Sequence, residues 1–411
     1  MFYRAAVILI IISISLKAQW YPQNTGTIYA LKSIYFINEQ TGFSCGYNTI
    51  LKTTNSGINW SNFYLTGNHQ SIFFTDLTNG FICSDSGKIF KTTNAGNTWV
   101  LKISGTINNL TSVNFYDANT GIITGLEKTL LKTTNSGENW FSVTNNLPEI
   151  NFLASEFIDA QNFYVTGSNS FIIKTTNGGL NWMQYTLGEV NPIFTIEFNS
   201  PSNGIATGCC GMLMVTTNGG INWTDYNYLS LGFTFYSLVF SDNNTGFMAG
   251  DNGMLYRTTD NGFNWDSTLT GTSQNLYSLF MLNNNTGWIS GGYGTILKTT
   301  NGGGPGYPIG INSISSDVPD KFMLYQNYPN PFNPETKIKF EIKSNEKNIN
   351  TKTELKIYDA LGTEISVLYS GFLTPGSYEI NYDGSNLPSG IYYYNLRSSE
   401  VSLTRKMVLL K

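Results

Sequence analysis

Short apolar runs and polar turns alternate along most of this chain. In one representative stretch, apolar residues dominate 71–75, 80–83 and 88–92, and clusters of Asn, Asp, Ser or Gly separate these runs. Runs of this length between turn residues are typical of antiparallel β-strands. The pattern therefore predicts an all-β protein built from short strands.

A turn sequence recurs at a fixed spacing through this pattern. Each copy has the form Thr-x-Asn/Asp-x-Gly, and the copies follow one another at 39 to 42 residues, beginning at Thr53, Thr92, Thr133, Thr175, Thr216, Thr258 and Thr299. The Asn or Asp side chain can accept backbone N–H bonds, and the Gly can take a positive φ. We therefore expect a structural turn, made by Asn55, Gly57 and Trp60 in the first copy and by Asp260, Gly262 and Trp265 in the sixth.

A tryptophan follows each of the first six turns and would begin a fourth strand. Four short strands in a repeat of this length are the blade of a β-propeller. The seventh turn runs into Gly304-Pro305 without a tryptophan, whereas Trp20 lies one repeat length before Trp60. We predict a seven-bladed β-propeller over 19–303, in which the strand at Trp20 completes the seventh blade and leaves no open sheet edge.

Composition and the first residues narrow the class of protein. Only 12% of residues are charged and the net charge is −4. Because no basic stripe is present, nucleic-acid binding by phosphate neutralisation is not expected. Residues 1–18 combine Arg4, an apolar run from Ala5 to Leu16, and Ala18, which predicts a secretory signal peptide with an ambiguous cleavage site. No other segment is predicted to cross a membrane.

The chain offers few residues for nucleophilic or metal chemistry. His69 is the one histidine, so a Ser-His or Cys-His pair has a single possible base; we expect His69 to be an exposed loop residue. Cys45 and Cys83 fall on equivalent strands of adjacent repeats and are expected to be buried free thiols. Cys209 and Cys210 could form a vicinal disulfide, but a free pair is favoured. We predict no metal site and no cofactor.

The repeats resemble two known families. The sequence Thr258-Thr-Asp-Asn-Gly-Phe-Asn-Trp265 resembles the Asp-box of bacterial neuraminidase repeats, and the other copies place Asn at the Asp position. With Thr-Gly-Phe elements at 41–43 and 245–247, the repeats are similar to the seven-bladed propellers related to the photosystem II assembly factor of plants and cyanobacteria. This resemblance implies the fold, and the box is a peripheral turn that implies no activity.

Two enzymatic functions are alternatives to a binding role. A sialidase would need clustered arginines, but the predicted ring holds Arg257 alone, in the slot that Lys52, Lys91, Lys132, Lys174 and Lys298 fill in other repeats. A secreted carbohydrate-active enzyme, a glycoside hydrolase, would need two facing carboxylates. Nothing in the sequence indicates that any two of the acids in predicted loops face each other. These acids are Asp85, Glu127, Glu149, Glu189, Asp225 and Asp251.

A non-catalytic binding or interaction protein is the function that the sequence favours. We expect its contact surface at one end of the ring, where turns within blades lie beside the loops between blades. Aromatic side chains there could stack on a sugar or anchor a protein partner; the candidates are Tyr64, Tyr226, Tyr228, Phe233 and Tyr293. The identity of this protein or glycan ligand and the oligomeric state stay open.

The repeat ends after residue 303. The stretch 304–320 is rich in Gly, Pro and Ser and predicts a linker. Beyond it, short strand-like runs at 338–342, 355–358, 378–382, 391–396 and 401–410 predict a small Ig-like β-sandwich over 321–411.

This sandwich resembles the type A C-terminal sorting domain of the type IX secretion system. The match is carried by 325–334, 357–362, 371–376, 383–393 and the terminal residues Lys406, Met407, Val408, Leu409, Leu410 and Lys411. The resemblance implies export to the periplasm by the signal peptide, then passage to the cell surface or medium by the type IX machinery, with release or anchoring left open. We expect an exposed last strand that the machinery recognises by strand addition.

Overall fold

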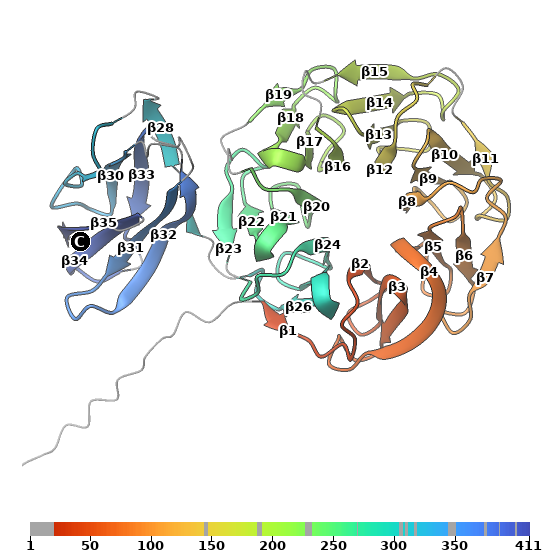
Figure 1. Ribbon diagram of the computed structural model, residues 1–411, viewed down its shortest axis with the longest axis horizontal. Helices are drawn as coiled ribbons and strands as arrows, with labels where there is room; N and C mark the ends of the chain where they lie inside the picture. The colour runs from red at the N-terminus through yellow and green to blue at the C-terminus, as the bar shows by residue number, and fades with distance from the viewer. Residues whose placement is uncertain are drawn as a thin grey trace, which may run out of the picture.

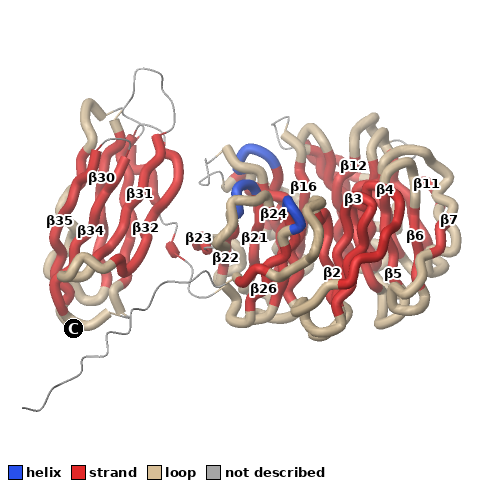
Figure 2. The backbone as a smooth tube through the Cα atoms, turned by 60° about the horizontal axis from the view of Figure 1, so that its bottom comes forward, coloured by secondary structure: helices blue, strands red, loops and turns tan. Residues whose placement is uncertain are grey.

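The computed structural model describes residues 20–143, 147–186, 191–226, 232–268, 270–303, 307–308, 311–315, 319–343, 351–373, 376–385, 387–398 and 401–411. Strands dominate these residues and form a ring of radial sheets and a two-sheet sandwich (Figures 1 and 2). The predicted fold class, an all-β propeller followed by a sandwich, is confirmed. The predicted signal peptide lies outside the described residues.

The described strands of the ring form seven blades, each read here from the axis outward. Blade 1 is β2 (Leu31–Phe36), β3 (Gly42–Thr53) and the start of β4 (Ser61–Phe74). Blade 2 is the rest of β4, β5 (Gly80–Ser84), β6 (Ile89–Thr92) and β7 (Val100–Lys102). Blade 3 is β8 (Leu110–Phe115), β9 (Gly121–Gly125), β10 (Thr129–Thr133) and β11 (Phe141–Ser142).

The remaining blades follow the same order. Blade 4 is β12 (Phe152–Phe157), β13 (Phe163–Gly167), β14 (Phe171–Thr175) and β15 (Met183–Thr186). Blade 5 is β16 (Ile193–Phe198), β17 (Gly204–Gly208), β18 (Leu213–Thr216) and β19 (Thr224–Asp225). Blade 6 is β20 (Phe235–Phe240), β21 (Gly246–Gly250), β22 (Leu255–Thr258) and β23 (Asp266–Thr268). Blade 7 is β24 (Leu276–Met281), β25 (Gly287–Gly291), β26 (Ile296–Thr299) and β1 (Tyr21–Pro22). Short 3-10 turns η1 (Cys209–Gly211), η3 (Asp251–Gly253) and η4 (Gly292–Gly294) follow the second strands of blades 5, 6 and 7.

The recurring Thr-x-Asn/Asp-x-Gly turn is held by its own side chains. In blade 3, the Thr133 hydroxyl accepts the N–H of Gly137 at 3.0 Å and donates to Asn135 Oδ1 at 3.0 Å. The same oxygen of Asn135 accepts the N–H of Asn139. The glycine has a φ of 70°, which a side chain would strain. The same hydrogen bonds recur at Asn55 and Gly57 in blade 1 and at Asp260 and Gly262 in blade 6.

Replacing Thr133 with Val is expected to lower the free energy of unfolding by about 1–3 kcal/mol, because the buried N–H of Gly137 loses its acceptor. Chemical denaturation of the variant measures this loss. Thr98→Val changes an exposed threonine in the corresponding turn of blade 2 and is expected to stay within about 0.5 kcal/mol of the wild type. Equal effects of both changes would contradict the structural role of the buried hydroxyl.

The repeated lysines join neighbouring blades. Lys52 Nζ donates to the carbonyl oxygen of Ala95 at 2.7 Å, in the turn of the next blade. Equivalent bonds run from Lys91 to Ser136, from Lys132 to Gly178 and from Lys174 to Gly219. The ammonium groups of these lysines also lie over aromatic rings, on the same blade for Lys52, Lys91 and Lys174 and on the next blade for Lys132. The slot that Arg257 shares is therefore a structural one on the outer part of the ring.

The seventh blade takes its outer strand from the start of the described chain. In β1, Tyr21 pairs with Lys298 of β26. This register matches the other blades, where the residue after the tryptophan pairs with the lysine slot, as Phe141 does with Lys132. Trp20 is fully buried, and a Cβ added to Gly303 of the seventh turn would lie 2.5 Å from its Nε1. Trp20 thus occupies the place that the seventh turn leaves empty.

The sandwich consists of two four-stranded sheets. One contains β28 (Ile311–Ser315), β33 (Gly376–Asp383), β30 (Glu335–Ile342) and β29 (Met323–Leu324), in this order. The other contains β32 (Glu364–Leu373), β31 (Thr351–Tyr358), β34 (Gly390–Ser398) and β35 (Val401–Leu409). Alternate residues of facing strands, such as Phe340, Ile380 and Tyr394, form one buried core.

Several sequence-based expectations need correction. His69 is 0% exposed and lies inside a strand, because β4 runs unbroken from blade 1 into blade 2. Cys209 and Cys210 form a disulfide in the turn η1, whereas a free pair was favoured. The stretch 304–320 is more than a linker: β27 (Tyr307–Pro308) pairs with β23, and β28 pairs with β33. Cys45 and Cys83 are buried free thiols, as expected.

Candidate functional site

The aromatic residues proposed as ligand contacts fall into different surroundings. Tyr64 and Tyr293 are each 76% exposed and lie on adjoining blades 1 and 7. Tyr226 packs against the core cluster of blades 5 and 6, and Phe233 is half-buried. Tyr228 lies outside the described residues. Of the four candidates that the structure describes, Tyr64 and Tyr293 are the two exposed ones, and Tyr226 and Phe233 are partly buried.

Two further tyrosines accompany the exposed pair. Tyr29 and Tyr47 are each about half exposed, with ring centroids 5.7 Å apart. Tyr29 belongs to the loop that enters blade 1, and Tyr47 to the bend within β3. We did not predict them because nothing in the repeat pattern distinguishes these positions from loop residues of other blades. Blades 7 and 1 therefore carry four exposed or half-exposed tyrosines, which we name together the tyrosine face: Tyr29, Tyr47, Tyr64 and Tyr293.

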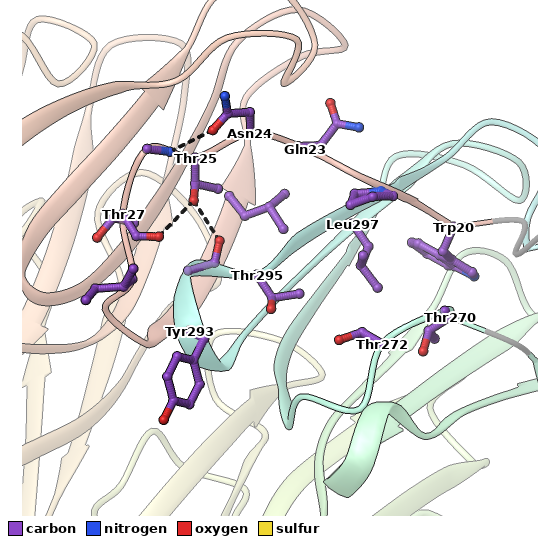
Figure 3. Close-up of a pocket in the computed structure, with 16 residues that line it drawn as sticks. Trp20, Gln23, Asn24, Thr25, Thr27, Thr270, Thr272, Tyr293, Thr295 and Leu297 are labelled. Atoms are coloured by element: carbon purple, nitrogen blue, oxygen red, sulfur yellow. Dashed lines mark hydrogen bonds between the residues drawn. The ribbon is translucent and has the colours of Figure 1, made fainter.

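A cavity of about 640 Å³ adjoins the tyrosine face (Figure 3). Segments from the loops around Thr25 and Thr270 and from the turn at Tyr293 line it, and the Thr25 hydroxyl donates to the carbonyl oxygen of Gly294 at 2.7 Å. A similar cavity of about 660 Å³ lies between Ser86–Lys88 and Leu101–Ile107. Since equivalent loops produce both hollows, their presence reflects the repeat and does not by itself define a ligand.

Three of the loop acids considered for hydrolysis have local structural partners: Asp85, Glu149 and Asp251. Asp251 accepts the N–H of Thr234 and the hydroxyl of Tyr236. Glu149 binds Lys128, and Asp85 lies 4.0 Å from Lys88. Glu127 and Asp225 are exposed, and Glu189 lies outside the described residues. These partners of Asp85, Glu149 and Asp251 are not other acids of this set.

His69 is poorly placed for catalysis. Its Nε2 lies 2.9 Å from the carbonyl oxygen of Leu65, and its ring packs edge-on to Phe90. Burial lowers the pKa of His69 below its ordinary value, so the imidazole is neutral near pH 7. Its Nδ1 is buried without a hydrogen-bond partner among the described residues. Within the described ranges, neither ring nitrogen of His69 is hydrogen-bonded to a serine or a cysteine.

Two carboxylates on the innermost strands, Glu156 and Glu197, are functional candidates that the sequence pattern did not indicate. Glu156 of β12 and Glu197 of β16 occupy the same position on innermost strands of neighbouring blades (Figure 1). Burial, and then the nearby Glu197 carboxylate, raise the pKa of Glu156 well above its ordinary value. Burial raises the pKa of Glu197 to about 7. Their one-repeat separation was visible in the sequence, but they lie in strands and only loop acids were considered.

Glu197→Gln is expected to make the protein more stable than the wild type at pH 8, and less so at pH 5. The raised pKa means that the folded state holds a proton that the unfolded carboxyl releases, so wild-type stability falls as pH rises from the ordinary value through about 7. The difference at pH 8 is on the order of 3 kcal/mol. Thermal unfolding at both pH values measures it.

Glu138→Gln is the matched control for this prediction. Hydrogen bonds from Lys102 and Lys91 lower the pKa of Glu138 to about 2, so no change in its protonation falls between pH 5 and pH 8. The control variant should therefore keep the pH dependence of the wild type. A Glu197→Gln variant with that same dependence would refute the assigned pKa.

The terminal strand of the sandwich is covered along the stretch proposed as the sorting signal. The N–H of Phe332 donates to the carbonyl oxygen of Val408, and the N–H of Leu410 donates to that of Phe332, both at 2.9 Å. Asn330 Oδ1 accepts the N–H of Val408. Met407 and Leu409 are buried, whereas Lys406, Leu410 and Lys411 are exposed. The expectation of an open last strand is therefore wrong here, because the segment around Asn330–Phe332 occupies its edge.

The ring and the sandwich define the class: a seven-bladed β-propeller with a C-terminal β-sandwich. Residues 326–410 match the family model of the secretion system C-terminal sorting domain. Residues 104–223 and 225–300 match the family model of photosynthesis system II assembly factor YCF48. The resemblances to the photosystem II assembly-factor propellers and to the C-terminal sorting domain are thereby confirmed. No curated protein is detectably similar to the chain in sequence.

Solved structures share the ring. A structure described as YCF48 bound to D1 peptide has a TM-score of 0.60 at 17% identity, covering 70% of this chain and 96% of that one. YCF48 from Cyanidioschyzon merolae gives 0.58 at 17% identity, covering 69% and 98%. The WD40 β-propeller domain of Doa1 gives 0.55 at 10% identity, covering 69% and 97%. Identities this low show the common fold alone.

The sorting-domain match implies export through the type IX secretion system and a cell-surface or extracellular location. Over the described ranges, no helical segment has the length and apolar character needed to cross a bilayer. Nowhere in those ranges do three or more His, Cys, Asp or Glu side chains gather closely enough to hold a metal ion.

Proposed function

We propose that the chain is an exported, non-catalytic binding protein, in which the ring contacts a protein or glycan partner and the sandwich directs secretion. The observation that carries the proposal is the tyrosine face: four exposed or half-exposed tyrosines on blades 7 and 1, two of them in ring contact. Tyrosines supply large contact area with little loss of side-chain freedom. The structure described as YCF48 bound to D1 peptide shows that a propeller of similar fold takes a peptide.

A glycan array and immobilised surface extracts of the producing cell, probed with the purified full chain, test this function. Tyr64→Ala and Tyr293→Ala are each expected to lower the affinity for the partner that this screen identifies by roughly tenfold, a typical loss for an aromatic contact residue. Tyr328→Ala is the control, because Tyr328 is equally exposed but lies in the sandwich. Binding that survives both ring substitutions would move the contact surface away from the tyrosine face.

A secreted glycoside hydrolase is the second candidate, and the axial carboxylates favour it over other enzymes. Two carboxyl groups with different protonation states are the catalytic equipment of such an enzyme. A hydrolysis screen with the full chain separates the two functions. Turnover that disappears in Glu156→Gln would replace the proposed function; no turnover on a broad panel of glycosides would support a binding role.

A further inference from the structure

The innermost strands present one ring of side chains at the level of Glu156 and Glu197. Each member directly precedes the large residue that packs between blades, such as Phe157 or Phe198. In blade order the members are Tyr35, Phe73, Asn114, Glu156, Glu197, Val239 and Phe280. Contacts join neighbours around this ring: Tyr35 lies 5.1 Å from Phe73 and 5.0 Å from Phe280 between ring centroids. We name these seven residues the axial tier.

The axial tier has an aromatic half and an acidic half. Phe280, Tyr35 and Phe73 come from blades 7, 1 and 2, whereas Glu156 and Glu197 come from blades 4 and 5 on the other side of the axis (Figure 1). Asn114 of blade 3 donates to Glu156 Oε2 at 3.4 Å and to the carbonyl oxygen of Ser155 at 2.9 Å. Neither glutamate belongs to an ion pair within the described residues.

The innermost strands around the axis provide no paired positive charge for the carboxylates of Glu156 and Glu197. The charged or titratable groups on the surrounding inner strands are Lys32, Tyr35, His69, Tyr236 and Tyr277, besides the glutamates themselves. Burial lowers the pKa of His69, so its imidazole is neutral near pH 7. Lys32 is committed elsewhere: its Nζ lies 3.8 Å from the centroid of the Tyr277 ring, nearer the other end of the strands. That contact shows that the inner wall accommodates an ammonium group on an aromatic face.

We propose that the axial tier binds the positively charged side chain of a partner protein, a lysine or arginine that enters along the axis. The carboxylates would pair with the cation while the aromatic half covers its apolar stem and offers ring faces to the charge. A metal ion fits less well, because two carboxylates are too few ligands and an aromatic half offers none. This inference rests on the proposed binding function and names the chemistry of one contact.

The test uses the full chain and two matched probes, the peptides acetyl-Gly-Gly-Lys-Gly-Gly-amide and acetyl-Gly-Gly-norleucine-Gly-Gly-amide. Titration calorimetry at millimolar peptide is expected to show binding of the lysine peptide at pH 8 and at least tenfold weaker binding of the norleucine peptide. Affinity for the lysine peptide should fall toward pH 5.5, since the carboxylates that hold the cation take up protons. Equal affinity for both peptides, or no change with pH, would overturn the proposal.

The double variant Glu156→Gln with Glu197→Gln is expected to lose lysine-peptide binding at least tenfold. Glu127→Gln, an exposed acid on blade 3, should bind like the wild type. Unchanged binding by the double variant would place the cation elsewhere. If the ring binds its surface partner through the tyrosine face but ignores the lysine peptide, this inference fails while the proposed function stands. Glycoside turnover abolished by the double variant would instead make the pair catalytic and refute both.

Discussion

Trp20→Ala is expected to lower the free energy of unfolding of the ring by about 3–5 kcal/mol, the usual loss for a buried tryptophan. Trp20 is fully buried in the cluster that joins blades 6 and 7, and its ring lies edge-on to Phe247 at 6.5 Å. No other residue of blade 7 can fill the space, because the seventh turn ends without a tryptophan. Denaturant unfolding of the variant measures the loss.

Tyr21→Ala is the control for the tryptophan. Tyr21 is the next residue and takes part in β1, but its side chain points to solvent and is half exposed. We expect this change to cost less than about 1 kcal/mol. If the two substitutions destabilise the protein equally, Trp20 does not stabilise the junction of β1 with β26. The main argument for a ring closed by β1 would then fail.

Phe332→Ala is expected to destabilise the sandwich by about 3–5 kcal/mol and to reduce the amount of protein at the cell surface. The Phe332 side chain is 1% exposed, and its backbone brackets the terminal strand through Val408 and Leu410. Removal of the phenyl side chain leaves a cavity under that strand and loosens the residues proposed as the sorting signal. Unfolding of the variant and surface labelling of cells that produce it measure the two effects.

Leu361→Ala is the matched control in the same domain. Leu361 is 92% exposed in a turn and contributes little to the core. Normal stability and normal surface display are expected. Full surface display of Phe332→Ala would mean that the secretion machinery does not need the covered edge of β35. If deletion of 406–411 then abolished display, recognition would depend on the exposed residues of that segment alone.

Periodicity predicted the ring because the information is local and repeated. Each turn carries its own hydrogen-bond acceptors, as Thr133 and Asn135 show, so seven copies could be recognised without knowing any contact between them. The missing tryptophan after Thr299 and the extra one at Trp20 then indicated how the ring closes. The register of Tyr21 with Lys298 follows the rule of the other blades.

Contacts between distant segments were beyond the reach of the sequence pattern. His69 was expected in a loop because a loop separates most blades, but β4 continues from one blade to the next and buries it. Glu156 and Glu197 meet only because the ring brings equivalent positions together at the axis. The cover over β35 includes Asn330, which lies 78 residues before its partner Val408, so its role cannot be recognised without the fold.

A disulfide engineered between β1 and β26 tests the closure of the ring most directly. Cysteines at positions 21 and 298, introduced by Tyr21→Cys and Lys298→Cys, replace directly paired residues of β1 and β26. Opposite residues of an antiparallel pair lie within the Cα spacing that a disulfide spans. Under mild oxidation, peptide mapping should find an intramolecular disulfide between these positions, whereas Tyr21→Cys with Leu297→Cys, displaced by one residue, should not form it. Free thiols at both positions, or a disulfide formed only between two molecules, would contradict a ring closed by its own first strand.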